Sequence, residues 1–276
     1  MLFRTFDCAA RHSGIFPSHM KTFRVLQFNM QFGQRWDADH PDTAPINLDL
    51  TLTEIQRHDA DIILLQEVEQ AQPGGQHVYP PPNYTQLRGA LTGYDGLFCY
   101  PKADPRELPF GIGLAIFSRT RLRETLQRDL PSPPVEFEFD GKQMTPTDRL
   151  LIGAETTVAG RNLRVFNTHL LAFFMLDPAT GEPPDQRRLV LNVLRSADEP
   201  TLIGGDFNVS KHEDLVGQFG AAGYQTVQST EITWRRRQYV LDHIFYSRQL
   251  RPLRYSVEPT PASDHHVLIA EFEFVD

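Results

Sequence analysis

Acidic, amide and imidazole side chains recur in this chain directly after apolar, strand-like runs. The tetrad Gly205-Asp206-Phe207-Asn208 is the most informative case, because it continues the run that starts at Thr201. Polar residues lie at or just beyond the ends of such runs at Asn29, Glu67, His169, Asp206, Asn208, Asp242, Asp264 and His265. An open sheet gathers its ligands in a crevice outside the carboxyl ends of its strands. We therefore expect all eight, each carboxyl-terminal to its strand, to form one active site, and the pattern predicts an enzyme.

The composition permits a large core. The chain has 276 residues, 40% of them hydrophobic, which suffices for one large domain or two layered halves. Its formal net charge of −8 argues against indiscriminate nucleic-acid binding, although a local basic patch with a metal ion still holds one phosphate. Cys8 and Cys99 are the only cysteines, so we expect neither a disulfide framework nor a cysteine zinc site.

No run of about 18 apolar residues is present, so we expect no transmembrane helix and no stable membrane insertion. Residues 1–20 lack the apolar core and cleavage site of a signal peptide. We expect them to be a loosely ordered leader or an upstream start that the fold does not need, with a short terminal strand or arm as the alternative. Residues 21–276 are expected to form a single catalytic domain. We expect a cytoplasmic monomer, although a secreted protein without disulfides would have the same composition.

Apolar runs and alternation predict more strands than helices. Strands are expected over residues 23–28, 61–66, 113–118, 150–158, 162–167, 201–205, 240–246 and 267–275, with a hairpin turn at Ala159-Gly160. Helices are expected over 47–58, capped by Asn47, and over 186–195, with Leu189, Val193 and Leu194 facing inward. This content favours an α+β or mixed α/β sandwich, with two sheets and the helices outside.

A carboxylate that follows a buried strand, such as Glu67, is costly unless it is solvated, paired or bound to metal. Taken alone, Glu67 is explained most simply as a strand-end acid paired with an arginine. The expected site adds further oxygen ligands from Asn29, Asp206, Asn208 and Asp264. Carboxylate and amide oxygens are what hard divalent ions such as Mg²⁺ bind, whereas no cysteine cluster or close histidine pair favours zinc.

The spacing of two in Asp206-Phe207-Asn208 places both polar side chains on one face of an extended segment. Phe207 then points the other way, into apolar packing. Gly204 and Gly205 have no Cβ, so other groups approach closely. The alternative is an Asx turn at a strand end, which is a common structure.

The segment Ser263-Asp264-His265 places a carboxylate beside an imidazole before the last strand. A lone histidine is more often structural or at the surface. Here Asp242 is available to orient His265 through its ring N–H, which fixes the tautomer and raises the basicity. His169 supplies a second imidazole. Two imidazoles, an Asp/Asn pair and a metal-binding carboxylate suit the attack of water on a phosphoester.

Six short elements, in this order, resemble the endonuclease/exonuclease/phosphatase superfamily of deoxyribonuclease I-like, Mg²⁺-dependent phosphoesterases. They are Phe28-Asn29, Gln66-Glu67, Asn167-Thr168-His169, Gly205-Asp206-Phe207-Asn208, Leu241-Asp242-His243-Ile244 and Ser263-Asp264-His265. The resemblance covers residues 21–276. It implies a four-layer αββα sandwich of two mixed β-sheets flanked by helices, and phosphoester hydrolysis that depends on Mg²⁺ or Mn²⁺.

The resemblance also implies roles for individual residues. Glu67 resembles the main metal ligand, and Asn29 and Asp264 resemble its assistants, directly or through water. Asp206 resembles the residue that orients or activates the attacking water, and Asn208 resembles a phosphate contact.

The two histidines are also similar to family positions. His265 resembles the imidazole at the phosphate, often drawn as the general base, and Asp242 its orienting acid. His169 resembles the second histidine of the deoxyribonuclease and sphingomyelinase branches. In the deoxyribonuclease branch a glutamate before the central strand is its partner, but residues 109–114 contain no acid here. We therefore expect His169 to lack that partner, which argues against a dominant general-acid role.

Two stretches bear on the choice of substrate. Trp234, Arg235 and Arg237 precede the Asp242 strand and are candidate substrate contacts that grip phosphate or stack a base, with a solvated loop face as an equal alternative. The apolar run 170–176 is expected to pack as core or to cover the substrate, rather than to touch lipid. No long aromatic hairpin is recognisable as a membrane anchor.

The leading hypothesis is a phosphodiesterase or nuclease that acts on nucleic acid or nucleotide-like phosphodiesters. The alternative substrate is a phospholipid, as for a sphingomyelinase, or an inositol or sugar-phosphate ester. A non-catalytic binding module ranks below both, because all the matched polar positions are present.

Overall fold

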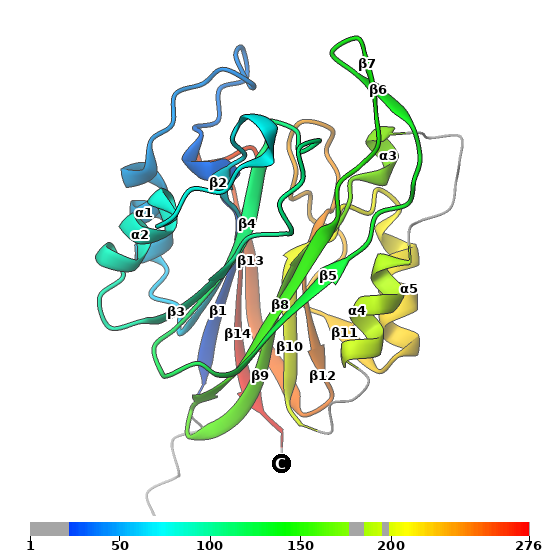
Figure 1. The fold of residues 1–276 in the computed structure, drawn as a ribbon. Helices are drawn as coiled ribbons and strands as arrows, with labels where there is room; N and C mark the ends of the chain where they lie inside the picture. Colours follow the sequence, from blue (N-terminus) through cyan, green and yellow to red (C-terminus); the bar gives the residue numbers. More distant parts are fainter. Residues whose placement is uncertain (1–21, 177–184, 195–198, 276) are drawn as a thin grey trace, which may run out of the picture.

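Two six-stranded β-sheets face each other in the computed structural model, which describes residues 22–176, 185–194 and 199–275 (Figure 1). The predicted leader, residues 1–20, lies outside the described residues. Each sheet is mixed, because β1 and β2 are parallel in the first and β9 and β10 are parallel in the second, whereas the other neighbours are antiparallel.

The strand order places β1 and β10 inside their sheets, away from the edges. The first sheet has the order β13 (Leu250–Glu258), β14 (Val267–Phe274), β1 (Phe23–Asn29), β2 (Ile62–Gln70), β4 (Gly111–Ser118) and β3 (Asp95–Cys99). The second has the order β11 (Tyr224–Thr226), β12 (Asp242–Ser247), β10 (Thr201–Asp206), β9 (Arg161–His169), β8 (Arg149–Val158) and β5 (Arg123–Leu130). A small hairpin pairs β6 (Phe137–Phe139) with β7 (Lys142–Met144).

Helices cover the outer faces of both sheets (Figure 1). The helices are α1 (Leu48–Arg57), α2 (Pro82–Ala90), α3 (Phe173–Leu176), α4 (Gln186–Leu194) and α5 (His212–Ala221), with short 3-10 turns at η1 (Gln31–Gly33) and η2 (Pro73–Gly75). Apolar residues of α1 and α2 are buried on the first sheet, and those of α4 and α5 on the second. A third apolar cluster fills the space between the sheets. The four-layer αββα sandwich is therefore confirmed.

Most predicted elements exist with small changes in their bounds. The hairpin turn is confirmed at Ala159 and Gly160, whose φ angles of 49° and 79° suit the two central positions of a tight β-turn. Asn47 caps α1 as predicted, because its side chain accepts a hydrogen bond from the N–H of Leu50 at 3.1 Å.

The inward face of α4 differs from the prediction. Leu194 is buried as expected, but Leu189 and Val193 are only half-buried. The buried stripe starts instead at Gln186, whose side-chain amide donates to the carbonyl of Leu130, and it continues through Val190 and Leu191. Residue 195, the predicted end of this helix, lies outside the described residues.

The two sheets lie close together at Gly204 of β10, which has no side chain. A Cβ added at Gly204 would lie 2.5 Å from Leu64 Cδ1 and 3.3 Å from Gln27 Cγ on the facing sheet. Glycine therefore allows β10 to lie directly against β1 and β2.

Among the helices in the described part of the chain, none has the length and apolar character needed to cross a lipid bilayer.

Candidate active site

Polar side chains from both sheets meet at one end of the sandwich. Asp206, the last residue of β10, pairs in register with His169 on β9 and with Asp242 on β12. Residues in register on neighbouring strands point to the same face, so these three side chains lie side by side. Asn29, at the end of β1, reaches them from the facing sheet.

Not all of these residues follow the carboxyl end of a strand, so that expectation is wrong in part. Asp242 is the first residue of β12, and Asp264 and His265 precede β14. Because β12 is antiparallel to β10 and β14 is antiparallel to β1, the amino ends of β12 and β14 lie at the same edge as the carboxyl ends of β10 and β1. Strand direction, rather than strand end, explains why the side chains still converge.

Glu67 does not follow its strand but lies inside β2, which continues to Gln70. It occupies a bulge, where the pairing with β4 shifts between Gln66 and Glu69, and its φ of 50° is unusual for a residue with a side chain. Gly111 on β4 makes room for it, since a Cβ there would lie 2.3 Å from both Cβ and Oε2 of Glu67. The bulge and the missing side chain together fix where the Glu67 carboxylate lies.

Asn29 links one carboxylate from each sheet. Its Nδ2 donates hydrogen bonds to Glu67 Oε1 at 3.0 Å and to Asp206 Oδ2 at 3.1 Å, and its Oδ1 accepts one from the N–H of Gln31 at 3.1 Å. The N–H of Gln31 can only donate, so it fixes the orientation of the fully buried amide. In this geometry Asn29 offers N–H groups, not oxygen, to the two acids.

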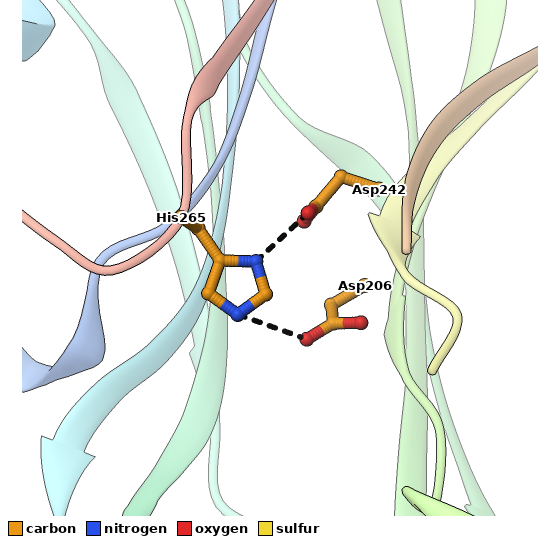
Figure 2. Close-up of side chains that lie close together, drawn as sticks. All are labelled: Asp206, Asp242 and His265. Atoms are coloured by element: carbon orange, nitrogen blue, oxygen red, sulfur yellow. Dashed lines mark hydrogen bonds and ion pairs between the residues drawn. The ribbon is translucent and has the colours of Figure 1, made fainter. Parts of the chain in front are cut away.

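His265 lies between two carboxylates (Figure 2). Its Nδ1 is 2.8 Å from Asp242 Oδ2, and its Nε2 is 3.6 Å from Asp206 Oδ2. Burial alone would lower the pKa of His265, but the charges of Asp242 and Asp206 outweigh it and raise that pKa to about 10. Burial likewise opposes ionisation of Asp242, yet His265 holds the pKa of Asp242 below its ordinary value. The two residues therefore form an imidazolium–carboxylate pair.

For Asp206 and Glu67, burial disfavours the ionised carboxylate more strongly than neighbouring groups favour it. Burial raises the pKa of Asp206 to about 8, and the charge of Asp242 adds to the rise. Burial also raises the pKa of Glu67 to about 6, against the hydrogen bond from Asn29. A bound divalent cation would favour the ionised forms of both acids.

His169 stays neutral beside them. Its Nε2 lies 3.5 Å from Asp206 Oδ2 and 3.9 Å from Glu67 Oε1. Burial, followed by the charges of Arg149 and His265, lowers its pKa to about 3. As the sequence indicates, residues 109–114 supply no acidic partner.

Asp264 is tied to the loop that precedes β12. Its Oδ2 accepts hydrogen bonds from Trp234 Nε1 at 3.1 Å and from Arg236 Nε, and Arg236 also pairs with Asp42 at 2.5 Å. Trp234 is buried, and its ring centroid lies 6.2 Å from that of His265. The indole therefore supports the site from within the protein.

The neighbouring arginines differ in exposure. Arg235 Nη2 donates to the carbonyl of Thr260 at 2.8 Å, and its guanidinium lies over the ring of Trp36. Arg237 is exposed, so it is the only one of the three predicted substrate contacts whose side chain is freely accessible.

Asn208 combines the two structures that the sequence left open. Its N–H donates to Asp206 Oδ1 at 3.0 Å, which is an Asx turn, and its φ of 50° ends the extended segment. Its Nδ2 donates to the carbonyl of Leu170 at 3.0 Å. The prediction of one extended face is therefore wrong, whereas the predicted burial of Phe207 is confirmed.

One charged residue at the site, Arg149, was not predicted from the sequence. Arg149 begins β8 next to Leu150, which pairs with His169 across β8 and β9. Its charge lowers the pKa of Glu67 and of His169, and its Nε is buried without a hydrogen-bond partner among the described residues. An arginine directly before the apolar run 150–158 was the only available hint.

The donor atoms fit a hard divalent cation, because they are oxygens from carboxylates rather than sulfur. Within the described ranges, Asp206, Asp242 and His265 have potential ligand atoms within 4.8 Å of one another (Figure 2). As an imidazolium, however, His265 has no lone pair to offer a metal. The Glu67 carboxylate is partly exposed and receives one hydrogen bond among the described residues, so it keeps lone pairs free for a cation.

Residues 26–265 match the sequence model of the Endonuclease/Exonuclease/phosphatase family. No curated protein sequence matches the chain. Among solved structures, a family protein from Bacteroides vulgatus is 19% identical, with 92% of this chain and 99% of that chain covered and a TM-score of 0.66. The human nocturnin catalytic domain with bound sulfate is 20% identical, with 92% and 94% covered and a TM-score of 0.57. Mannosyl-6-phosphatase from Bacteroides thetaiotaomicron is 19% identical, with 91% and 100% covered and a TM-score of 0.61.

The chain thus belongs to the endonuclease/exonuclease/phosphatase family, whose members are divalent-metal-dependent hydrolases of phosphoester bonds. The likenesses in structure confirm the fold, and the family match places the chain among enzymes.

The space at Gly111 gives a testable consequence. In Gly111→Ala the new methyl group would overlap Glu67, so we expect kcat/KM for bis-p-nitrophenyl phosphate with Mn²⁺ to fall by about tenfold or more. Gly217→Ala in α5 is the matched control, because nothing lies within 4 Å of its added Cβ. Equal activity in the two variants would contradict the proposed placement of Glu67.

The raised pKa values of Asp206 and Glu67 predict a pH dependence of stability. Both groups favour the folded state most below their ordinary pKa values, and this contribution is lost as the pH rises through about 6 for Glu67 and about 8 for Asp206. We expect the Tm of the metal-free wild-type protein, relative to that of Asp206→Asn, to fall between about pH 5 and pH 8. Parallel Tm curves for the two proteins would show that Asp206 is not the group responsible.

Proposed function

We propose that the chain is a phosphodiesterase that hydrolyses nucleic acid or nucleotide-like phosphodiesters by in-line attack of metal-assisted water, without a covalent enzyme intermediate. The observation that carries this proposal is the position of Asp206. Its carboxyl group lies within 3.6 Å of both His265 and His169 and is joined to Glu67 through Asn29. A proton acceptor, two imidazoles and a metal-binding carboxylate are thus gathered within reach of one phosphate.

Glu67 is the main metal ligand in this proposal, and Asp264 assists it directly or through water. The predicted role of Asn29 as a ligand is wrong for this geometry, because Asn29 turns its N–H groups toward the acids and acts by orienting Glu67. The proposed ion is Mg²⁺, or Mn²⁺, and when bound it neutralises charge on the phosphoryl oxygens. Asn29 holds Glu67 through N–H. Trp234 and Arg236 occupy Asp264 Oδ2, whereas Asp264 Oδ1 receives only a long hydrogen bond of 3.5 Å from Ser263 Oγ.

Proton transfer falls to the protein. Asp206 orients the attacking water and, in its ionised form, takes the proton of that water; its raised pKa makes this carboxylate a stronger base than an ordinary aspartate. The His265 imidazolium, held by Asp242, stabilises the developing negative charge on the phosphoryl group. His169, which is neutral, lies on the other side of Asp206 and donates a hydrogen bond near the leaving group.

Two further groups complete the proposed contacts with phosphate. Asn208 is half-buried at the end of β10, next to Asp206, and keeps a second side-chain N–H beyond the one it gives to Leu170. Arg149 supplies the buried guanidinium N–H that has no partner among the described residues.

Exposed aromatic rings near Glu67 favour a substrate with a base. Phe110, directly before Gly111, is 50% exposed, and its ring packs edge-on against Phe139 at 5.7 Å. Phe139 lies on the β6–β7 hairpin, at the end of the sandwich where β2 ends and β8 begins (Figure 1). An exposed ring beside a phosphate site provides a surface on which a base stacks, and Arg237 adds an accessible charge.

The second candidate is a sugar-phosphate or phospholipid ester, and a pocket lined by both polar and apolar side chains favours the sugar. A pocket of about 160 Å³ lies beside the end of β2. Hydrogen-bonding side chains line much of it, including Glu69, Gln70, Gln72, Gln76 and Tyr100. Carboxylate and amide groups beside an aromatic ring suit sugar hydroxyls.

The single catalytic domain over residues 21–276, the monomeric state and the cytoplasmic location stay predictions.

A substrate panel tests the proposed class. Single-stranded DNA, abasic duplex, RNA, sphingomyelin and inositol phosphates are incubated with the protein and Mg²⁺ or Mn²⁺, with Glu67→Gln as the inactive control. We expect cleavage of at least one polynucleotide and its loss in Glu67→Gln. Cleavage of lipid or sugar phosphate alone would overturn the leading candidate, and no hydrolysis of any ester would overturn the catalytic proposal.

Removing His265 separates catalysis from folding. We expect His265→Ala to lower kcat by roughly 10²- to 10⁴-fold, because the stabilising imidazolium is lost. The free energy of unfolding, measured with urea, should change far less. Comparable losses in activity and stability would assign His265 a structural role only.

A further inference from the structure

Three buried amide side chains connect the two sheets directly beneath the site. Gln27 on β1 donates from Nε2 to Gln66 Oε1 on β2 at 2.7 Å and to Asp242 Oδ1 on β12 at 2.9 Å. Gln66 donates from Nε2 to Asn167 Oδ1 on β9 at 2.7 Å. Asn167 donates from Nδ2 to the main-chain carbonyls of Leu65 and Ala115 at 2.8 and 2.9 Å. All three amides and Asp242 are fully buried.

The direction of every hydrogen bond in this amide chain is fixed at one end. Main-chain carbonyls only accept, so Asn167 must turn its NH₂ toward Leu65 and Ala115 and its oxygen toward Gln66. Gln66 must then donate to Asn167 and accept from Gln27. Gln27 is left with its NH₂ facing Asp242, and a flipped amide would place oxygen against two oxygens. Asp242 Oδ1 is thereby held as an acceptor.

Gln27 keeps this orientation although its own oxygen gains nothing from it. Gln27 Oε1 is buried and accepts no hydrogen bond within the described part of the chain. An unpaired buried acceptor costs free energy. If these three positions contributed only packing, apolar side chains would fill them without that cost. The stem of Gln27 also has little freedom, because Gly204 of the facing sheet approaches its Cγ.

We propose that Gln27, Gln66 and Asn167 are positioning residues that fix the Asp242 carboxylate in the orientation that holds His265. Asp242 Oδ1 is taken by Gln27, which leaves Oδ2 directed at His265 Nδ1 at 2.8 Å. Hydrogen bonds between side chains of β1, β2, β9 and β12 thus fix the position of the His265 imidazole. This inference rests on the proposed function, in which His265 acts at the phosphate.

A double-mutant cycle tests it. We expect Gln27→Met, which keeps the length of the side chain but removes the donor, to lower kcat by about 10- to 100-fold with little change in KM. In an Asp242→Asn background the same substitution should cost almost no further activity, because Gln27 acts through Asp242. Additive losses, or an unchanged kcat in Gln27→Met, would overturn the inference.

A matched control exists at the opposite end of the sandwich. Thr156 on β8 and Ser118 on β4 are also fully buried and share a hydrogen bond between the sheets at 2.9 Å. We expect Thr156→Val to lower stability without changing kcat. If Thr156→Val and Gln27→Met lower kcat equally, the amides only join the sheets and the inference fails.

A structural readout keeps the inference separate from the proposed function. If the wild-type protein hydrolysed no phosphoester, the proposed function would fail, but the crystal structure of Gln27→Met would still test the amide chain. We expect Asp242 to turn and its contact with His265 to lengthen beyond hydrogen-bond range. An unchanged contact of 2.8 Å would overturn the inference. Gln66→Met breaks the same chain one link away and replaces Gln27→Met if that variant does not fold.

Discussion

The mutual repulsion of buried carboxylates is the constraint on which the rest of the structure depends. Glu67 comes from one sheet, Asp206 and Asp242 from the other, and all three lie within a single seam. Asp206 and Asp242 are buried there and Glu67 is half-buried, so water screens them poorly and each needs a hydrogen-bond donor or a cation. Asn29 joins Glu67 to Asp206, and His265 neutralises Asp242, yet burial still holds the pKa values of Glu67 and Asp206 above their ordinary values. A divalent cation beside these acids would favour their ionised forms, and its charge would also attract an anionic ester.

Local backbone irregularities deliver these groups where regular strands could not. A regular β2 would have turned every second side chain toward the seam, whereas the bulge directs Glu67 there immediately after Gln66. Gly111 leaves the space that the carboxylate fills, and Gly204 lets the sheets lie close enough for Gln27 to reach Asp242. The left-handed conformations of Glu67 and Asn208 are costly for residues with side chains, and strain of this kind is typical of functional sites.

The buried strands of the fold were predictable from the sequence, because β2, β4 and β10 contain apolar runs and β1 alternates apolar and polar residues. The edge strands β5 and β13 were not, since their exposed faces carry charged residues that hide the alternation. The polar residues of the site were visible because each interrupts an apolar pattern. Their exact placement was not, because the bulge at Glu67 and the antiparallel directions of β12 and β14 are consequences of pairing. Arg149 was missed because a charged residue at the start of a strand has no distinctive pattern.

The position of a bound ion tests the central claim most directly, namely that Glu67 holds the metal while Asp206, Asp242 and His265 act on water and phosphate. Anomalous diffraction from crystals soaked in Mn²⁺ locates the ion without reference to activity. The account predicts a peak beside the Glu67 carboxylate, with the contact between His265 and Asp242 intact. A peak enclosed by Asp206, Asp242 and His265, with Glu67 out of contact, would contradict it.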